Sequence, residues 1–133
     1  MITGRDGPLL AALAAVGVGA VFGAWLRWGL AYWLNPRLEH LPLGTLAANL
    51  VGGYLIGVAV AVFAVHPALS PFWRLLVVTG FLGGLTTFST FSAENIALLA
   101  SGAWGGALLH AGLHLVGSLA ATAVGIASVR AFT

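Results

Sequence analysis

The sequence predicts an all-helical membrane protein with four transmembrane helices and no soluble domain. Hydrophobic residues make up 60% of the 133 residues and charged residues only 6%, whereas a soluble domain carries about 25% charged residues. The intervals between the charges include apolar runs of the length, roughly 20 residues, that a helix needs to cross a bilayer. We therefore expect residues 1–133 to form a single multi-pass domain in the plasma membrane, which is the inner membrane of a cell that has two.

The charge and cysteine content exclude several other classes of protein. Five basic residues and a net charge of +2 are too sparse for a nucleic-acid-binding face, which needs clustered basic residues. The chain has no cysteine, so it has neither disulfides nor thiolate metal ligands. Neither a phosphate-binding G-x-x-x-x-G-K-[ST] motif nor a G-x-S-x-G nucleophile motif is present, and we expect no enzymatic activity.

The first two helices are predicted at Leu9–Leu34 and Leu43–Val65. The apolar run at residues 7–26 is long for the core of a secretion signal, and we interpret it as part of the first span. Near the end of that span, Arg27 is surrounded by aromatic residues that are typical of a membrane interface; they are Trp25, Trp28, Tyr32 and Trp33. The loop at 35–42 contains two prolines, and the second helix ends before His66-Pro67.

The third helix is predicted to open at Ser70-Pro71 and to run to about Ala100, with a break near Gly83-Gly84. A turn at 101–106 leads into the fourth helix at about 107–129. Small residues repeat at spacing four along the spans, a pattern that lets membrane helices approach closely. The repeats are Gly19/Gly23, Gly53/Gly57, Gly80/Gly84 and Ala121/Gly125.

Arginines are divided almost evenly between the two predicted membrane sides. Arg5, Arg74 and Arg130 lie on one side, and Arg37 and the marginal Arg27 lie on the other. Under the positive-inside rule, this small difference in the number of arginines favours neither orientation strongly, so the chain could insert in both. Because four helices are few for enclosing a pathway, we expect an oligomer, and an antiparallel dimer fits the charge distribution.

Residues 80–94, GFLGGLTTFSTFSAE, are the strongest functional signal in the chain. Lipid cannot satisfy hydroxyls, a carboxylic acid or a broken backbone, so these groups must face protein or a wet cavity. Carbonyls freed at a break near Gly83 and Thr86 are suitable ligands for a hard cation such as sodium. The alternative is a simple glycine kink relieved by neighbouring hydroxyls.

Two further groups of residues suggest an ion pathway. The ring edges of Phe88 and Phe91 carry partial positive charge and stand among hydroxyls that include Ser89, where they could hold a small anion; the alternative is core packing. On the fourth helix, polar residues recur every four positions and form a stripe, although hydroxyls there could instead bond back to the carbonyl four residues earlier. The members of this stripe are His110, His114, Ser118 and Thr122.

Three single polar residues complete the set of candidates. Asn49 offers an amide donor to an anion, or an interhelical hydrogen bond. Arg27 is either an anion funnel or an anchor at the interface. Glu94 pairs with Arg27 or a backbone donor, or it is the protonatable group of a transporter.

Taken together, these residues resemble the Fluc/CrcB family of fluoride channels. GFLGGLTTFSTFSAE is similar to the third-helix signature of the family, and GTLAANLVGGYLIG is similar to its second-helix motif. Gly23-Ala24 with Arg27 resembles the arginine motif at the end of the first helix, and the fourth helix matches most loosely.

The resemblance implies an antiparallel, dual-topology homodimer with two fluoride pathways and a structural sodium ion at its centre. It implies that backbone oxygens of Gly83 and Thr86 bind the sodium, and that Arg27 and Glu94 support the site. The residues expected along the fluoride pathway are Asn49, Phe88, Ser89, Phe91, His114, Ser118 and Thr122.

On this basis we expect a passive fluoride channel that lowers cytoplasmic fluoride and confers fluoride resistance, with no organic cofactor. An alternative is a small proton-coupled multidrug exporter of the four-helix antiparallel type, in which Glu94 would carry the proton. A third class is a membrane subunit that transports nothing.

Overall fold

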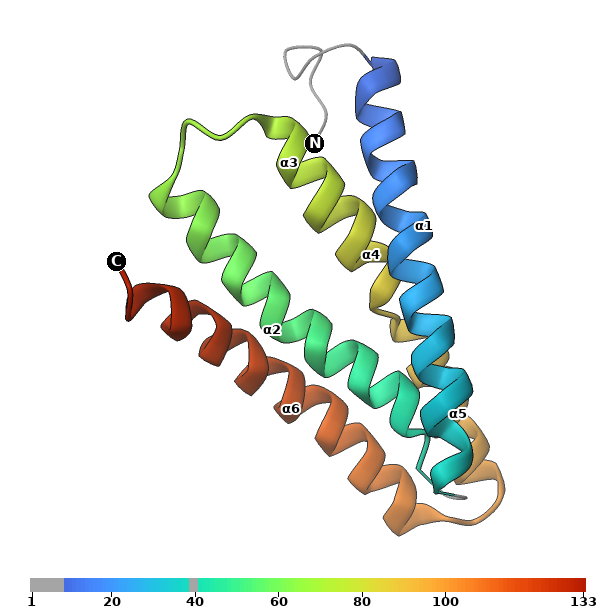
Figure 1. Cartoon of the computed structure of the whole chain (residues 1–133). Helices are drawn as coiled ribbons and strands as arrows, with labels where there is room; N and C mark the ends of the chain where they lie inside the picture. The colour runs from blue at the N-terminus through green and yellow to red at the C-terminus, as the bar shows by residue number, and fades with distance from the viewer. Residues whose placement is uncertain (1–8, 39–40) are drawn as a thin grey trace.

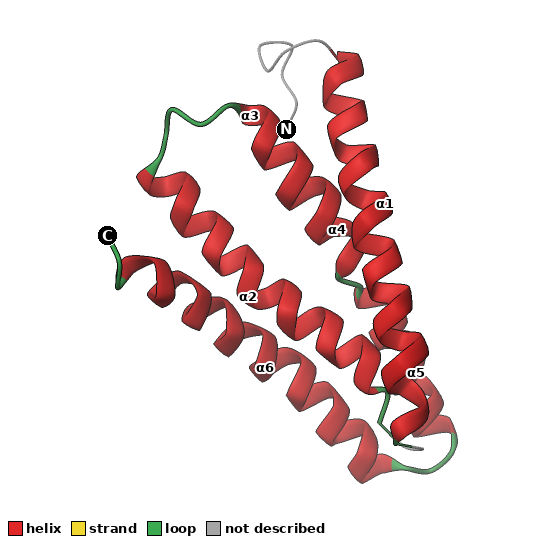
Figure 2. Cartoon of the chain, viewed as in Figure 1, coloured by secondary structure: helices red, strands yellow, loops and turns green. Residues whose placement is uncertain are grey.

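The computed structural model describes residues 9–38 and 41–133, and the fold is a bundle of helices (Figure 1). Every regular element within the described residues is helical (Figure 2). Four helical segments are long and apolar enough to cross a membrane. The chain runs up and down the bundle, so that each span is antiparallel to the next. Arg5, which the sequence analysis assigned to one membrane side, lies outside the described residues.

The first two spans begin and end where the sequence predicts. Helix α1 covers Leu9–Leu34, a short 3-10 helix η1 covers Asn35–Arg37, and α2 covers Leu43–Val65. The aromatic side chains at the end of α1 point outward, as expected for residues that contact the membrane–water interface. Trp25, Trp28, Tyr32 and Trp33 are each 60–67% exposed.

The third span is interrupted, but the break lies three residues beyond the predicted glycine pair. It consists of α3 (Pro71–Arg74), the π-helix η2 (Leu75–Leu82), α4 (Gly83–Leu85) and α5 (Phe88–Ala100). Gly83 is helical, with φ −62° and ψ −36°, whereas Thr86 and Thr87 have ψ of 152° and 120°.

The prediction of a break at Gly83-Gly84 was therefore slightly misplaced, and the threonines explain why. The Thr87 side chain accepts a hydrogen bond from the Thr90 amide at 3.1 Å and acts as the N-cap of α5. An N-cap residue needs an extended backbone, which Thr87 has. Gly84 serves helix contact instead, since an added Cβ there would meet the Ala20 carbonyl oxygen at 2.5 Å.

Helix α6 covers Trp104–Arg130 and starts three residues earlier than predicted. The predicted turn at 101–106 included Gly105 and Gly106, which have low helix propensity, but tertiary context overrides propensity and both are helical. The turn is made earlier, at Gly102, whose φ of +78° is a conformation that suits glycine.

Glycines allow the spans to touch backbone to backbone, as the spacing-four pattern indicated. On α1, a Cβ at Gly23 would collide with the Phe81 carbonyl of η2. On α2, a Cβ at Gly57 would collide with the Thr122 carbonyl of α6. These contacts produce two tightly packed pairs: α1 with the first half of the third span, and α2 with α6.

Away from these helix contacts, the large apolar side chains point outward from the bundle. Leu10, Leu108, Leu119 and Val116 are among many that are 65–80% exposed, which would be unfavourable in water. With four spanning helices, the chain is a multi-pass membrane protein.

Gly23→Ala should lower the free energy of unfolding by about 1–3 kcal/mol, the usual cost of overpacking a well-packed contact. Gly17 is the matched control on the same helix, because nothing lies within 4 Å of a Cβ built there. Gly17→Ala should be neutral or stabilise the protein by up to about 1 kcal/mol through helix propensity. Unfolding midpoints in detergent measure both; equal effects would contradict the close-contact interpretation.

Candidate functional site

The break in the third span is held by Asn49, one turn and a half into α2. The Asn49 Nδ2 group donates to the Thr87 carbonyl oxygen at 3.0 Å, and the Thr87 amide donates to Asn49 Oδ1 at 2.8 Å. One side-chain amide thus satisfies both polar groups of a peptide backbone that has left the helix. In a lipid environment such groups have no water to bind, so this pair allows the break to exist.

Arg27 performs a similar task on the other side of the break. In a continuous helix the Gly84 carbonyl would accept from the amide four residues later, at Phe88. Here Arg27 Nε donates to the Gly84 oxygen at 2.9 Å. The structure therefore connects Arg27 to the broken backbone, a role that neither an interface anchor nor an anion funnel describes.

A groove of about 530 Å³ runs beside the break between α2, the third span and α6. Gly83 and Thr86 line it, and so does Thr87. The groove brings together six of the seven residues predicted for the pathway. They are Asn49, Phe88, Phe91, His114, Ser118 and Thr122.

Ser89 is the predicted pathway residue that does not line this groove. Its side chain is exposed, and its hydroxyl lies 3.1 Å from Thr87 Oγ1. Thr87 Oγ1 also lies 3.1 Å from the Thr90 hydroxyl. These three hydroxyls form a small network around the start of α5.

The polar stripe on α6 faces α2 and α5, but its hydroxyls differ in what they offer. The Thr122 hydroxyl lies 2.9 Å from the carbonyl oxygens of both Gly53 and Ser118 and shares its one hydrogen between them. Thr122 thus makes the bond to the i−4 carbonyl considered above and presents oxygen lone pairs to the groove. Within residues 9–38 and 41–133, the Ser118 hydroxyl makes no hydrogen bond and is available to a ligand.

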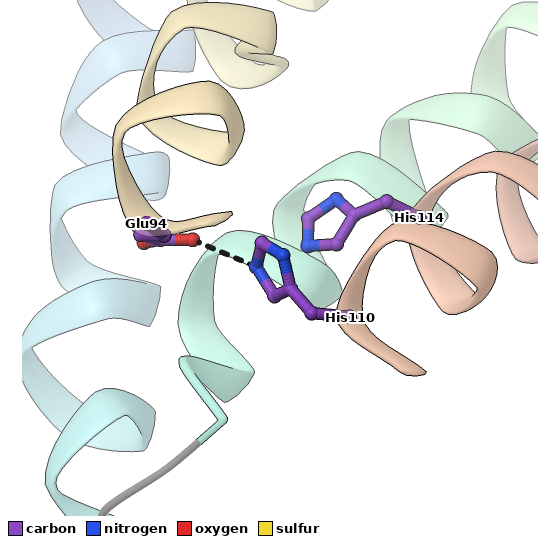
Figure 3. Close-up of side chains that lie close together, drawn as sticks. All are labelled: Glu94, His110 and His114. Carbon is purple, nitrogen blue, oxygen red and sulfur yellow. Dashed lines mark hydrogen bonds and ion pairs between the residues drawn. The ribbon is translucent and has the colours of Figure 1, made fainter. Parts of the chain in front are cut away.

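Glu94 belongs to a second polar cluster, next to the groove. The Thr45 hydroxyl donates to Glu94 Oε1, and His110 Nε2 lies 3.2 Å from Glu94 Oε2 (Figure 3). Pairing with Arg27 was one of the three alternatives for Glu94; among the described residues its carboxylate oxygens contact Thr45 and His110 instead.

Phe91 connects the groove with this cluster. Its ring stacks on His110 with centroids 5.1 Å apart and lies 4.7 Å from the His114 ring. The two imidazoles are themselves 4.5 Å apart. Phe88 packs against Phe91 at 5.4 Å, so the four rings form one continuous aromatic surface from the groove into the protein.

Comparison of the sequence with known protein families assigns this chain to one of them. The sequence model of the family described as "CrcB-like protein, Camphor Resistance (CrcB)" matches residues 14–126. The chain belongs to the CrcB family.

Several relatives similar to this chain carry the name "Fluoride-specific ion channel FluC". The protein of Cupriavidus pinatubonensis is 60% identical over 124 residues, which is 93% of this chain and 97% of the relative. That of Cupriavidus metallidurans is 64% identical over 117 residues, covering 88% and 93% of the two chains. That of Thiobacillus denitrificans is 56% identical over 121 residues, covering 91% and 98%.

Two residues of the polar cluster around Glu94 were not among the residues predicted from the sequence. Thr45 donates to Glu94, and Asn95 Nδ2 donates to the Ala107 carbonyl at 2.9 Å and lies 3.1 Å from His110 Nδ1. Asn95 directly follows Glu94 in an apolar span, and this costly position was the available signal. Thr45 lies in the Gly-Thr pair of the second-helix motif.

Arg27→Gln should destabilise the protein by about 1–3 kcal/mol, because the Gly84 carbonyl loses its donor in a partly buried place. Arg37 is the matched control: its Nε also donates to a backbone carbonyl, that of Trp33, but at an exposed site. Arg37→Gln should change the free energy of unfolding by no more than about 0.5 kcal/mol. Faster hydrogen exchange at the Thr87 amide, which donates to Asn49 Oδ1 at the break, should accompany the first change alone. If both variants unfold alike, Arg27 does not stabilise the break.

Proposed function

We propose that this protein is a fluoride-selective passive ion channel of the plasma membrane that exports fluoride and lowers its cytoplasmic concentration. The observation that carries the proposal is the lining of the groove. It combines an amide, hydroxyls and phenyl rings, and it contains no aspartate, glutamate, lysine or arginine. The names of the relatives point to the same ion.

Such a lining suits a small anion that must enter and leave quickly. Fluoride surrenders its water only if other donors replace it, and a fixed positive charge would hold it too long. The Ser118 hydroxyl and the positive edges of Phe88 and Phe91 attract an anion without a full charge. Passive flow through one membrane domain spanning residues 1–133 needs no catalytic step.

The proposal includes a homodimer of two oppositely oriented copies, surrounded by lipid. Phe88 is 79% exposed in the single chain even though it lines the groove. A ring that guides an ion must be shielded from lipid, and a second copy would cover it. The even division of arginines supports opposite orientations.

A structural sodium ion is also part of the proposal, and the residues fit it. In a continuous helix the Gly83 carbonyl would accept from the Thr87 amide, which donates to Asn49 instead. The Thr86 carbonyl would accept from the Thr90 amide, which donates to Thr87 Oγ1. Two carbonyls that have given up their helical donors are suitable oxygen ligands for a hard cation, which would tie the broken backbones together.

No observation favours the multidrug exporter. Its chemistry needs a carboxylate facing a transport cavity, and Glu94 does not line the groove. Glu94 is engaged by Thr45 and His110 instead.

Purified protein in vesicles should release fluoride without a proton gradient, as followed with a fluoride electrode. Phe88→Ile and Phe91→Ile should each reduce the rate about tenfold or more, because the isoleucine side chain has no positive ring edge. Phe22→Ile is the control, since Phe22 is 57% exposed on α1 and makes an edge contact with Trp25. Release of lipophilic cations driven by a pH gradient, without fluoride release, would refute the channel.

Inserting one glycine between Leu85 and Thr86 should abolish fluoride release, because it separates the Gly83 and Thr86 carbonyls proposed to bind sodium. Thr86→Ala should retain partial release, since only the main chain supplies the ligand. A glycine inserted between Gly102 and Ala103, in the turn before α6, is the control and should be tolerated. Normal conduction by the first insertion would remove the sodium proposal.

A further inference from the structure

Glu94, His110 and His114 have the composition of a metal site. One ligand atom from each lies within 4.8 Å of the others, and the three side chains converge in Figure 3. Two histidines and one carboxylate are a familiar ligand set for divalent transition metals. Whether they bind a metal depends on which nitrogen of each imidazole carries the proton, because only the unprotonated nitrogen can coordinate.

Asn95 determines the proton position in His110. The Asn95 Nδ2 group lies 2.9 Å from the Ala107 carbonyl oxygen, which can only accept, so this atom is the amide nitrogen and not the oxygen. The same Nδ2 lies 3.1 Å from His110 Nδ1. The His110 Nδ1 atom must therefore accept, and the ring proton is on Nε2, where it points at Glu94.

Asn49 determines the proton position in His114 by the same logic. The Thr87 amide can only donate, which identifies Asn49 Oδ1, and Nδ2 is left to contact His114 Nδ1 at 3.1 Å. His114 Nδ1 accepts, and its proton is on Nε2. His114 is only 5% exposed, and its Nε2 has no hydrogen-bond partner among the described residues.

We infer that Asn49 and Asn95 hold both imidazoles as Nε2–H donors, and that the unpaired N–H of His114 binds the permeating fluoride while the cluster excludes divalent metals. The identity of the anion rests on the proposed function; the proton positions do not. A buried donor without a partner is unfavourable, and an anion bound to it removes that cost.

The surroundings of His114 fit a small anion that is bound weakly. Phe91 packs against the ring and also lines the groove, so the ion reaches His114 beside the same ring edge that we propose it passes. The Glu94 carboxylate repels an anion at this place, but its charge is shared with the donors Thr45 and His110. The His114 N–H attracts the anion while Glu94 repels it. Binding is therefore weak enough for the anion to leave, as conduction requires.

Nitrogen NMR of protein labelled with ¹⁵N-histidine tests the proton positions directly. Both His110 and His114 should show neutral rings protonated at Nε2, with assignments from His110→Asn and His114→Asn. Sodium fluoride should shift the His114 Nε2 resonance and leave that of exposed His66 unchanged, whereas sodium chloride should shift neither. A ring protonated at Nδ1, or a His114 signal indifferent to fluoride in a conducting protein, overturns the inference.

Zinc provides a second test on fluoride release from vesicles. The wild-type protein should be insensitive to micromolar zinc, because no nitrogen lone pair faces Glu94. Asn95→Asp should become zinc-sensitive, since a carboxylate accepts a hydrogen bond and so favours the tautomer with the proton on His110 Nδ1, which leaves Nε2 unprotonated for the metal. Carrying His66→Ala in both proteins removes an exposed histidine as an unrelated zinc ligand. Zinc inhibition of the wild type that His114→Ala abolishes would overturn the inference.

His114→Ala should slow fluoride release about tenfold or more, the loss expected when a hydrogen bond to a charged partner is removed, and His66→Ala should not. An unchanged rate in His114→Ala contradicts the anion site while leaving the channel intact. If the wild-type protein releases no fluoride, the proposed function fails, and the proton positions still stand or fall on the NMR spectra.

Discussion

The fold depends on satisfying broken backbone inside a membrane. Water is absent there, so each peptide group that leaves the helical ladder needs a protein partner. Asn49 supplies both a donor and an acceptor to Thr87, and Arg27 supplies a donor to Gly84. Each partner comes from a different helix, α2 and α1, so the break is stable only when the spans are assembled around it. The site and the fold are therefore formed by the same few hydrogen bonds.

Close packing of glycines makes these side-chain contacts geometrically available. Arg27 reaches the third span because Gly23 and Gly84 bring α1 against it. Asn49 reaches it because Gly52 leaves room for the Thr86 side chain, and Gly57 brings α2 against α6. The same approach places His110 and His114 within reach of Asn95 and Asn49. Small residues thus control how near the polar groups come to one another, and the polar groups then determine the shape and chemistry of the groove.

The sequence predicts more of the helices than of the contacts between them. Proline and apolar run length are local signals, and they identify the ends of α1 and α2 correctly. The break at Thr86-Thr87 was predicted three residues too early, because its position depends on Asn49, 38 residues away. The roles of Asn95 and Thr45 were not predicted for the same reason. A hydrogen bond to a partner on another span produces no pattern in the local sequence.

The π-helix η2, Leu75–Leu82, makes the two halves of the third span unequal in their tolerance of length changes. Amides in a π-helix bond five residues back rather than four, so this stretch holds a surplus residue. A deletion within it can be absorbed by a return to α-helical winding, which leaves the downstream register intact. In α5 no surplus exists, and losing one residue there would rotate everything beyond it by about 100°. Natural deletions should consequently accumulate in this stretch rather than in α5.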